Sequence, residues 1–287
     1  MAQHLKLIAL LIFTLSASYT SAQSLRKLLE RPYGIIESKW EKDAQGTTEL
    51  NYYNEDYCDY YLYRANDRSY NLSNGKNTIF KIEKNAQVDN PFKSASSYTF
   101  YRGKFPKDFN IQTPYALPVK NNQKTAWKTD PREPFKTLNF HIKQGDTIYA
   151  TRSGIACKTT NPQQLLIYHP DQTFAAYLVM NENFIEPGEC PLYSIIRLYC
   201  TNSFVSGHPR FAYALPSLSF FLDENKFKGG LSSGYPYSHF IPVFRTTEGD
   251  VKPEEKTIYQ AVTDHDLIMQ DMSKRDKKKY MKLHNLK

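Results

Sequence analysis

This chain of 287 residues has few of the features that mark common protein classes: long hydrophobic runs, paired metal-binding cysteines and nucleotide-binding loops. The one nearly unbroken apolar run, Leu7 to Leu15, is too short to span a bilayer. The cysteines form no Cys-x-x-Cys pair, so a zinc knuckle or thioredoxin-like site has no support. A Gly-rich phosphate loop and a Gly-x-Ser-x-Gly motif are also missing, which removes the sequence signals for nucleotide binding and serine hydrolysis.

Histidine is missing from residue 5 to residue 140, and glycine is scarce at 12 residues against 22 Tyr and 17 Phe. Tyr and Phe favour strands. Short apolar runs alternate with Asn, Asp, Ser and Gly turns in the first part of the chain, without a helical period between them. The sequence therefore predicts an all-β fold, beginning with a small β-sandwich-like domain.

The first residues are typical of a secretion signal. Lys6 supplies a positive start, the apolar run follows, and Thr20-Ser21-Ala22 fits the small-x-small cleavage rule. We predict a signal peptide over residues 1–22, a mature chain from Gln23, and export to the periplasm or the exterior; the alternative is an N-terminal anchor helix. The net charge of +8 suits solubility, and also contact with anionic polymers.

All four cysteines, at positions 58, 157, 190 and 200, lie in the exported part, where disulfides are permitted. Cys190 and Cys200 flank a predicted strand that would hold them on the order of 30 Å apart, too far to pair. We therefore expect Cys157 to pair with Cys190 or Cys200. Cys58 would then be free or paired between modules.

The chain divides into an N-terminal β domain over residues 23–112, a second β module over 113–246 and a tail over 247–287. In the first domain we expect strands at Tyr33–Glu41, Thr48–Tyr53, Cys58–Arg64, Thr78–Glu83 and Ser97–Tyr101. In the second we expect strands at Leu138–Ile142, Thr147–Ala150, Gly154–Lys158, Gln164–His169, Thr173–Val179, Leu192–Tyr199 and Arg210–Leu215. Residues 105–113 are predicted to be a linker.

Two segments of the second module carry a resemblance. Gly145 to Ala156 reads Gly-Asp-Thr-Ile-Tyr-Ala-Thr-Arg-Ser-Gly-Ile-Ala, and His169 to Met180 reads His-Pro-Asp-Gln-Thr-Phe-Ala-Ala-Tyr-Leu-Val-Met. They resemble strands of the lysostaphin/LytM-type peptidoglycan endopeptidases, which are zinc metallopeptidases, over residues 113 to about 216. The layout is also similar to that of exported Bacteroidetes-like relatives. The resemblance implies an antiparallel LytM-type sheet.

The zinc ligands that this family carries are missing here. By spacing, the family's His and Asp ligands fall on Phe135 and Asn139, and the His of its Tyr-x-His-Leu segment falls on Val179. Its His-x-His falls best on Arg210 and Ala212. Since an Asn carbonyl is a poor zinc ligand and the other four side chains cannot ligate zinc, we expect no zinc and no catalysis.

Two further hypotheses concern the remaining residues of this region. A zinc site rebuilt from His141, His169 and His208 is the enzymatic alternative, although surface or hydrogen-bonded histidines are the commoner outcome. If the catalytic site is lost, binding can remain. His141 and His169, with the aromatic residues Tyr177, Phe211 and Tyr213, are the candidate lining of a cleft for a peptide or glycan.

The tail changes character. Capping boxes at Thr263–Asp266 and Ser273–Asp276 predict short helices, the second rich in Lys. Such a helix either touches an anionic surface or docks its few apolar residues on the body, and we expect the second outcome.

These observations together predict an exported, non-catalytic LytM-like protein that binds the cell wall or regulates a wall hydrolase. The alternatives are an active zinc endopeptidase of peptidoglycan with a rearranged site, and a structural or surface-assembly protein whose groove is filled by Phe135, Val179 and Tyr213. No nucleic-acid motif occurs, so a nucleic-acid partner is not expected.

Overall fold

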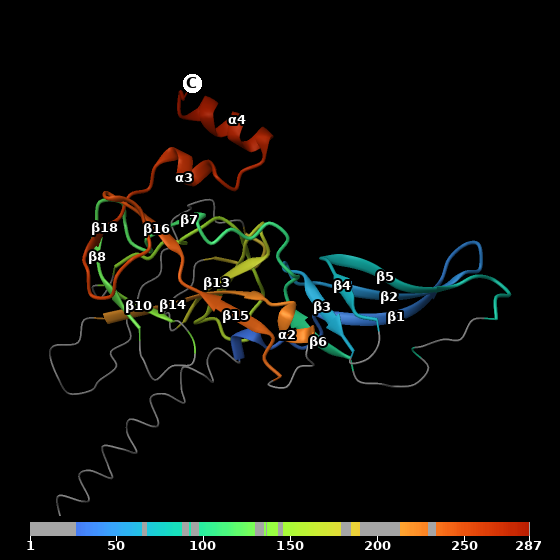
Figure 1. Cartoon of the computed structure of the whole chain (residues 1–287). Coiled ribbons are helices and arrows are strands. Elements are labelled where there is room, and N and C mark those ends of the chain that lie inside the picture. The colour runs from blue at the N-terminus through green and yellow to red at the C-terminus, as the bar shows by residue number, and fades with distance from the viewer. Residues whose placement is uncertain are drawn as a thin grey trace, which may run out of the picture.

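The computed structural model describes residues 27–64, 68–87, 92, 98–129, 135, 137–142, 146–178, 185–189, 213–228 and 234–286, with only the backbone for 213–216. These residues form an all-β fold of several, mostly antiparallel, sheets with short helices near the C-terminus (Figure 1), as the composition predicts. The signal-peptide prediction falls outside the described residues. None of the helices described is long and apolar enough to cross a membrane.

The N-terminal part holds two three-stranded antiparallel sheets, ordered β1-β2-β5 and β4-β3-β6. Their strands lie where the alternating patterns predict them, apart from β4, which is too short to predict. Their bounds are β1 Ile36–Lys42, β2 Thr48–Asn54, β3 Tyr60–Tyr63, β4 Tyr70–Leu72, β5 Gly75–Ile82 and β6 Thr99–Arg102.

The central sheet has the order β11-β12-β13-β14-β10-β9, and β15 pairs with the C-terminal half of β14. All residues of β13 are buried, because both faces of the sheet are covered. The bounds are β9 Trp127–Lys128, β10 Leu138–Ile142, β11 Ile155–Ala156, β12 Leu165–Tyr168, β13 Thr173–Tyr177, β14 Tyr213–Leu222 and β15 Tyr237–Phe240.

Two hydrophobic clusters cover the two faces of this sheet. Ala175 and Tyr177 of β13 belong to the cluster within the second module. Phe174 and Ala176 point the other way, into a cluster that also holds Tyr60 and other residues of the N-terminal part. The predicted domain boundary at residues 112 and 113 thus stays a prediction, and the residues on its two sides share one buried cluster.

The remaining strands are short, and the last two lie in the segment predicted as the tail: β7 Pro114–Ala116, β8 Lys124–Thr125, β16 Val243–Thr246, β17 Gly249–Val251 and β18 Tyr259–Gln260. The strand predicted at Thr147–Ala150 does not form. Its residues alternate in burial like a strand, but they make only single hydrogen bonds to the segment beside them, such as Tyr149 N–H to the Pro118 carbonyl at 3.2 Å. The prediction of a strand at Thr147–Ala150 is therefore wrong, because alternating burial alone does not supply a pairing partner.

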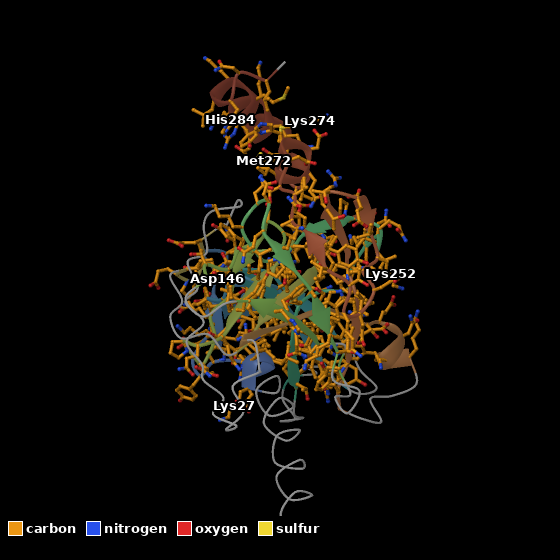
Figure 2. All side chains as sticks on the ribbon, turned by 90° about the vertical axis from the view of Figure 1, so that its left-hand side faces the viewer. Lys27, Asp146, Lys252, Met272, Lys274 and His284 are labelled. Atoms are coloured by element: carbon orange, nitrogen blue, oxygen red, sulfur yellow. The ribbon has the colours of Figure 1, made fainter. Side chains whose placement is uncertain are left out.

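Three helices are described with bounds: α2 Asn225–Lys228, α3 His265–Met269 and α4 Lys274–Leu283. Ser273 caps α4 by accepting a hydrogen bond from the Asp276 amide, as predicted, whereas α3 is capped by Asp264. Leu267 of α3 is buried, but α4 buries no residue and Leu283 is 78% exposed. The expectation that the basic helix docks on the body is therefore wrong: α4 stands clear of the sheets (Figures 1 and 2).

Candidate functional site

Strand β10 carries Asn139, the residue on which the resemblance would place the family's Asp ligand. Leu138, Phe140 and Ile142 point into the core, whereas Asn139 and His141 share the opposite, more exposed side. The Asn139 amide donates to the Lys128 carbonyl at 3.4 Å, at the edge of hydrogen-bond reach. This side offers a neutral amide and one exposed imidazole.

Phe135, on which the resemblance would place the family's first His ligand, is packed among aromatic rings. Its ring centroid lies 4.9 Å from that of His239 and 5.4 Å from that of Tyr235. Tyr235 and His239 are stacked, and 2.7 Å separates the Tyr235 hydroxyl from His239 Nε2. His239 also lies beside Phe220 across the β14–β15 pair. Phe135 is thus held by contacts with the rings of Tyr235 and His239.

The partner strand of β10 brings no imidazole to this place. Asn139 pairs in register with Pro216 of β14, and no residue of β13 or β14 is a His. Of the other predicted positions, Val179, Arg210, Phe211 and Ala212 lie outside the described residues, as does His208. Tyr213 begins β14, and only its backbone is described.

Tyr177 is fully buried and does not line an open cleft. Its hydroxyl accepts a hydrogen bond from the Thr151 backbone amide at 2.8 Å and lies 2.8 Å from the Thr151 hydroxyl. Burial raises the pKa of Tyr177 to about 12, so the phenol stays protonated at neutral pH. Tyr177 therefore supports the core, because its hydroxyl ties the end of β13 to the segment before β11.

His169 is also buried, at 1% exposure, and does not line an open cleft either. Its Nδ1 lies 2.7 Å from the Ser153 carbonyl, so Nδ1 carries the proton and donates it. Its Nε2 has no hydrogen-bond partner. Burial, aided by repulsion from Arg152, lowers the pKa of His169 to about 4, which keeps the ring neutral.

Gly154 explains why the Arg-Ser-Gly run fits beside this histidine. A Cβ atom on Gly154 would come within 2.5 Å of the Tyr168 carbonyl oxygen and 3.0 Å of His169 Nδ1. Backbone cannot give way to such a contact cheaply. The two family-like segments thus meet at this point, through the close approach that the glycine permits.

Arg152 joins these segments to the tail. Its Nε and Nη2 donate to both carboxylate oxygens of Asp271 at 2.8 Å, and its Nη1 donates to Asp171 at 2.6 Å. Burial opposes ionisation of Asp171, but the charge and hydrogen bonds of Arg152 hold the pKa of that carboxyl below its ordinary value. This bidentate contact fixes the α3–α4 connection on the body.

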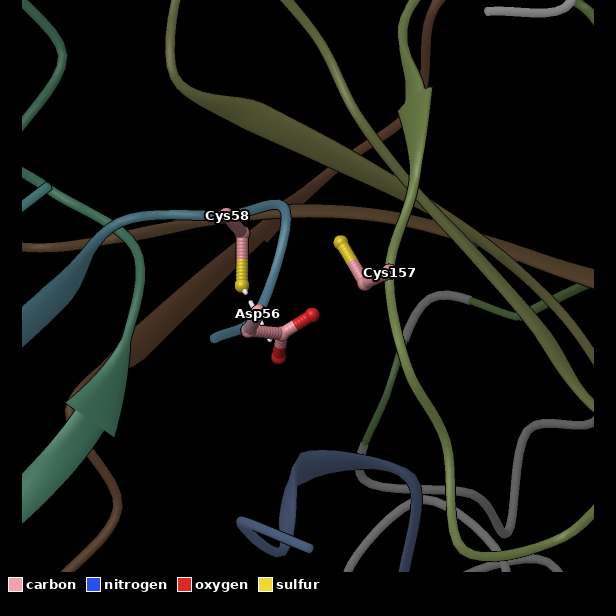
Figure 3. Close-up of side chains that lie close together, drawn as sticks. All are labelled: Asp56, Cys58 and Cys157. Carbon is pink, nitrogen blue, oxygen red and sulfur yellow. Dashed lines mark hydrogen bonds between the residues drawn. The ribbon is translucent and has the colours of Figure 1, made fainter. Parts of the chain in front are cut away.

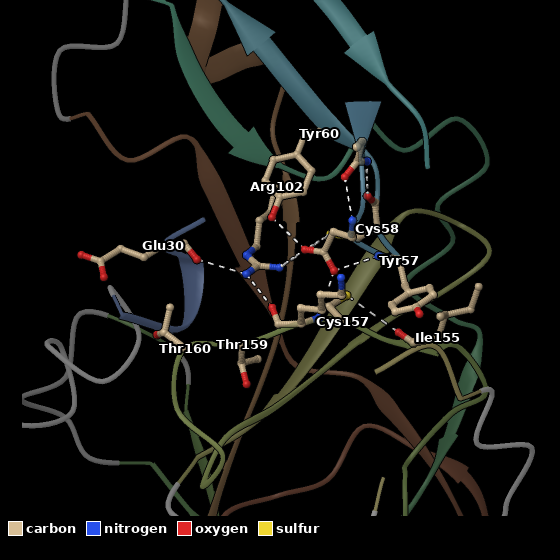
Figure 4. A network of polar contacts seen from close by, with 12 residues as sticks. Glu30, Tyr57, Cys58, Tyr60, Arg102, Ile155, Cys157, Thr159 and Thr160 are labelled. Carbon is tan, nitrogen blue, oxygen red and sulfur yellow. Dashed lines mark hydrogen bonds and ion pairs between the residues drawn. The ribbon is translucent and has the colours of Figure 1, made fainter. Parts of the chain in front are cut away.

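A second buried network lies where the N-terminal part meets the central sheet (Figure 4). Asp56 Oδ2 accepts from Arg102 Nη1 at 2.6 Å and from the Tyr60 hydroxyl at 2.8 Å. Asp56 Oδ1 accepts from the backbone amides of Tyr57 and Lys158. Arg102 Nη2 donates to the carbonyls of Glu30 and Lys158, so the Asp56–Arg102 ion pair links four segments of the chain.

Two thiols border this network, Cys58 and Cys157, and both are free. Cys157 therefore does not make its expected pairing with Cys190 or Cys200, which lie outside the described residues. With Asp56 they form the one cluster of three metal-ligating side chains in the part of the chain that the structure describes (Figure 3). His141 and His169 are not part of it.

The residues that the resemblance would align with the zinc ligands do not fit a catalytic zinc, as far as the structure describes them. Phe135 is packed against rings, Asn139 offers a neutral amide, and the buried His169 already uses Nδ1. Comparison with protein-family models, with curated proteins and with solved structures found no match for this chain. The site has therefore to be interpreted from its own geometry.

Sequence reasoning missed the two arginine networks. Arg152 and Asp171 lie inside the two segments that carry the resemblance, but the sequence pattern of these segments does not show that the two residues pair. Asp271, Asp56 and Arg102 carry no local signal, because their partners lie far away in sequence. A buried charged residue needs an oppositely charged partner, so knowing which residues are buried would have predicted such pairs. The sequence does not show which charged residues are buried.

Proposed function

We propose that this chain is an exported, non-catalytic LytM-like protein that binds the cell wall. The observation that carries the non-catalytic part is the packing of Phe135 against His239 and Tyr235. A zinc ligand at this position would have to replace a ring in that cluster. Proton transfer would also need imidazoles, and β13 and β14 supply none.

Helix α4 supports the binding part. Its ten residues, KRDKKKYMKL, include six basic residues and one acidic residue. A shallow hollow on it is lined by Lys and two apolar residues: Lys274, Lys277, Lys278, Met281, Lys282 and Leu286. Because α4 lies away from the body and Arg152 holds its root through Asp271, these charges are presented on a fixed arm. Their chemistry suits an anionic wall polymer rich in carboxylate or phosphate.

The catalytic question is tested on the purified mature chain by zinc analysis and by release of fragments from peptidoglycan. We expect neither stoichiometric zinc nor release. Asn139→Asp, alone or with Phe135→His, should restore neither property, because the remaining ligand position is still empty. One zinc per chain, with release lost on chelation and on His141→Gln substitution, would show that a rearranged peptidase site exists.

Binding is tested by co-sedimentation with insoluble peptidoglycan at rising salt. The variant Lys277→Gln/Lys278→Gln/Lys282→Gln should bind more weakly, by up to about 100-fold, because each of the three charges near an anionic surface contributes up to about 1 kcal/mol. The matched control, Lys226→Gln/Lys228→Gln/Lys252→Gln, removes the same charge from exposed positions elsewhere and should bind as the unchanged protein does. An equal loss of peptidoglycan binding in both variants would show that binding depends on overall charge and not on α4.

A structural role in surface assembly is the second candidate, and the aromatic packing of Phe135 favours it too. The sedimentation assay distinguishes surface assembly from wall binding. A structural protein that merely fills its groove shows no binding to peptidoglycan at low salt, with or without the α4 charges.

A further inference from the structure

The side chains of Cys58 and Cys157 lie close together at the junction between the N-terminal part and the central sheet, with the Cys58 sulfur turned toward Asp56 (Figure 3). Cys58 precedes β3, and Cys157 follows β11. Their sulfur atoms and a carboxylate oxygen of Asp56 all lie within 4.8 Å of one another. Both side chains are buried, at 1% and 3% exposure.

We infer that Cys58 and Cys157 form a disulfide that covalently joins the N-terminal part to the central sheet. A disulfide sulfur–sulfur bond is about 2.05 Å long, so the two sulfur atoms have to move closer together before the bond forms. Their present partners are weak. Cys58 Sγ donates to Asp56 at 3.6 Å and Cys157 Sγ to the Ile155 carbonyl at 3.8 Å. Little hydrogen bonding is lost when the bond forms.

A bound metal is the competing use of the same cluster, and the surrounding charges oppose it. Both carboxylate oxygens of Asp56 already accept hydrogen bonds, and Arg102 carries a buried positive charge against the cluster. Its Nη1 lies 2.6 Å from Asp56 and 3.8 Å from Cys58 Sγ. A divalent cation would have to displace that guanidinium or share the cavity with it. A neutral disulfide needs neither.

The chemistry balances through thiol–disulfide exchange. Each cysteine gives up one proton and one electron, the sulfur–sulfur bond forms, and a donor disulfide, of a protein or of glutathione, takes up the electrons and protons as two thiols. Burial raises the pKa of the Cys157 thiol, which makes thiolate scarce in the folded protein. The bond therefore closes while the chain folds, before the junction is sealed.

The disulfide inference does not rest on wall binding. Refolding in vitro tests it whether or not the chain is exported. The reduced mature chain is refolded with a mixture of glutathione and its disulfide, free thiols are alkylated in denaturant, and the digest is mapped by mass spectrometry. We expect a crosslinked peptide pair containing Cys58 and Cys157. Four alkylated cysteines, or Cys157 crosslinked to Cys190 or Cys200, overturn the inference.

Matched variants extend the test to stability. Cys190→Ser/Cys200→Ser leaves Cys58 and Cys157 as the only cysteines, so its melting temperature should fall by roughly 5–15 °C when reductant is added. Cys58→Ser/Cys157→Ser should already melt at the lower temperature and should not respond to reductant through this pair. If instead the first variant ignores reductant and holds one zinc per chain, the cluster is a metal site and the inference fails.

Discussion

Acid titration of His169 offers the sharpest test of the buried junction between the two family-like segments. The ring donates from Nδ1 to the Ser153 carbonyl, and its Nε2 faces the interior without a partner. A second proton would place a positive charge on Nε2 in a site that water does not reach and that Arg152 already charges positively. For this reason the pKa of His169 falls to about 4, against the ordinary value of 6.5.

The sign and size of the effect follow from proton linkage. Above pH 6.5 the ring is neutral in the folded and the unfolded chain, and its contribution to stability is fully present. Between pH 6.5 and 4 the unfolded chain takes up a proton that the folded chain refuses, so stability falls by 1.36 kcal/mol per pH unit. Over this interval the loss is about 3 kcal/mol, and below pH 4 it levels off. Asp171, whose pKa lies below its ordinary 3.8, loses its contribution only at lower pH.

The measurement is denaturant unfolding of the mature chain at pH 7, 6, 5 and 4. The unchanged protein should lose about 3 kcal/mol through His169 across this range, and His169→Gln, which cannot titrate but can still donate to Ser153, should lose that much less. His141→Gln, a change at an exposed position, should keep the slope of the unchanged protein. The reasoning is refuted if His169→Gln shows the same slope as the unchanged protein.

Three further predictions concern the two arginine networks and the tight glycine. Asp56→Asn should lower the free energy of unfolding by about 3–5 kcal/mol, because it leaves a buried guanidinium without its anion; Glu37→Gln, in an exposed ion pair, should change it by less than about 1 kcal/mol. Gly154→Ala should cost about 1–3 kcal/mol or prevent folding, since its Cβ meets backbone oxygen at 2.5 Å, and thermal unfolding measures this. Asp271→Ala should free the tail from Arg152 and speed limited trypsin cleavage after the lysines of α4, while the body stays resistant; an unchanged cleavage rate would show that Asp271 does not hold the tail.

Alternation of apolar and polar residues was enough to place β10, which spans Leu138–Ile142 as predicted and turns Asn139 and His141 to one side. The same rule failed at Thr147–Ala150, where Ile148 and Ala150 are buried in alternation but the backbone has no ladder partner. Alternation of apolar and polar residues indicates an extended chain with one buried side. Whether such a chain becomes a strand depends on a neighbour, and the neighbour is chosen by the tertiary fold.

The sequence by itself determined the class of fold, the N-cap of the last helix and the lack of histidines where the resemblance would require them. These properties are local, because each depends on residue types a few positions apart. Tertiary structure alone decided that Tyr177 and His169 are buried, since a strand does not reveal whether both of its faces are covered. It also decided that Cys58 meets Cys157: their proximity comes from a junction between segments far apart in the chain, which no spacing rule encodes.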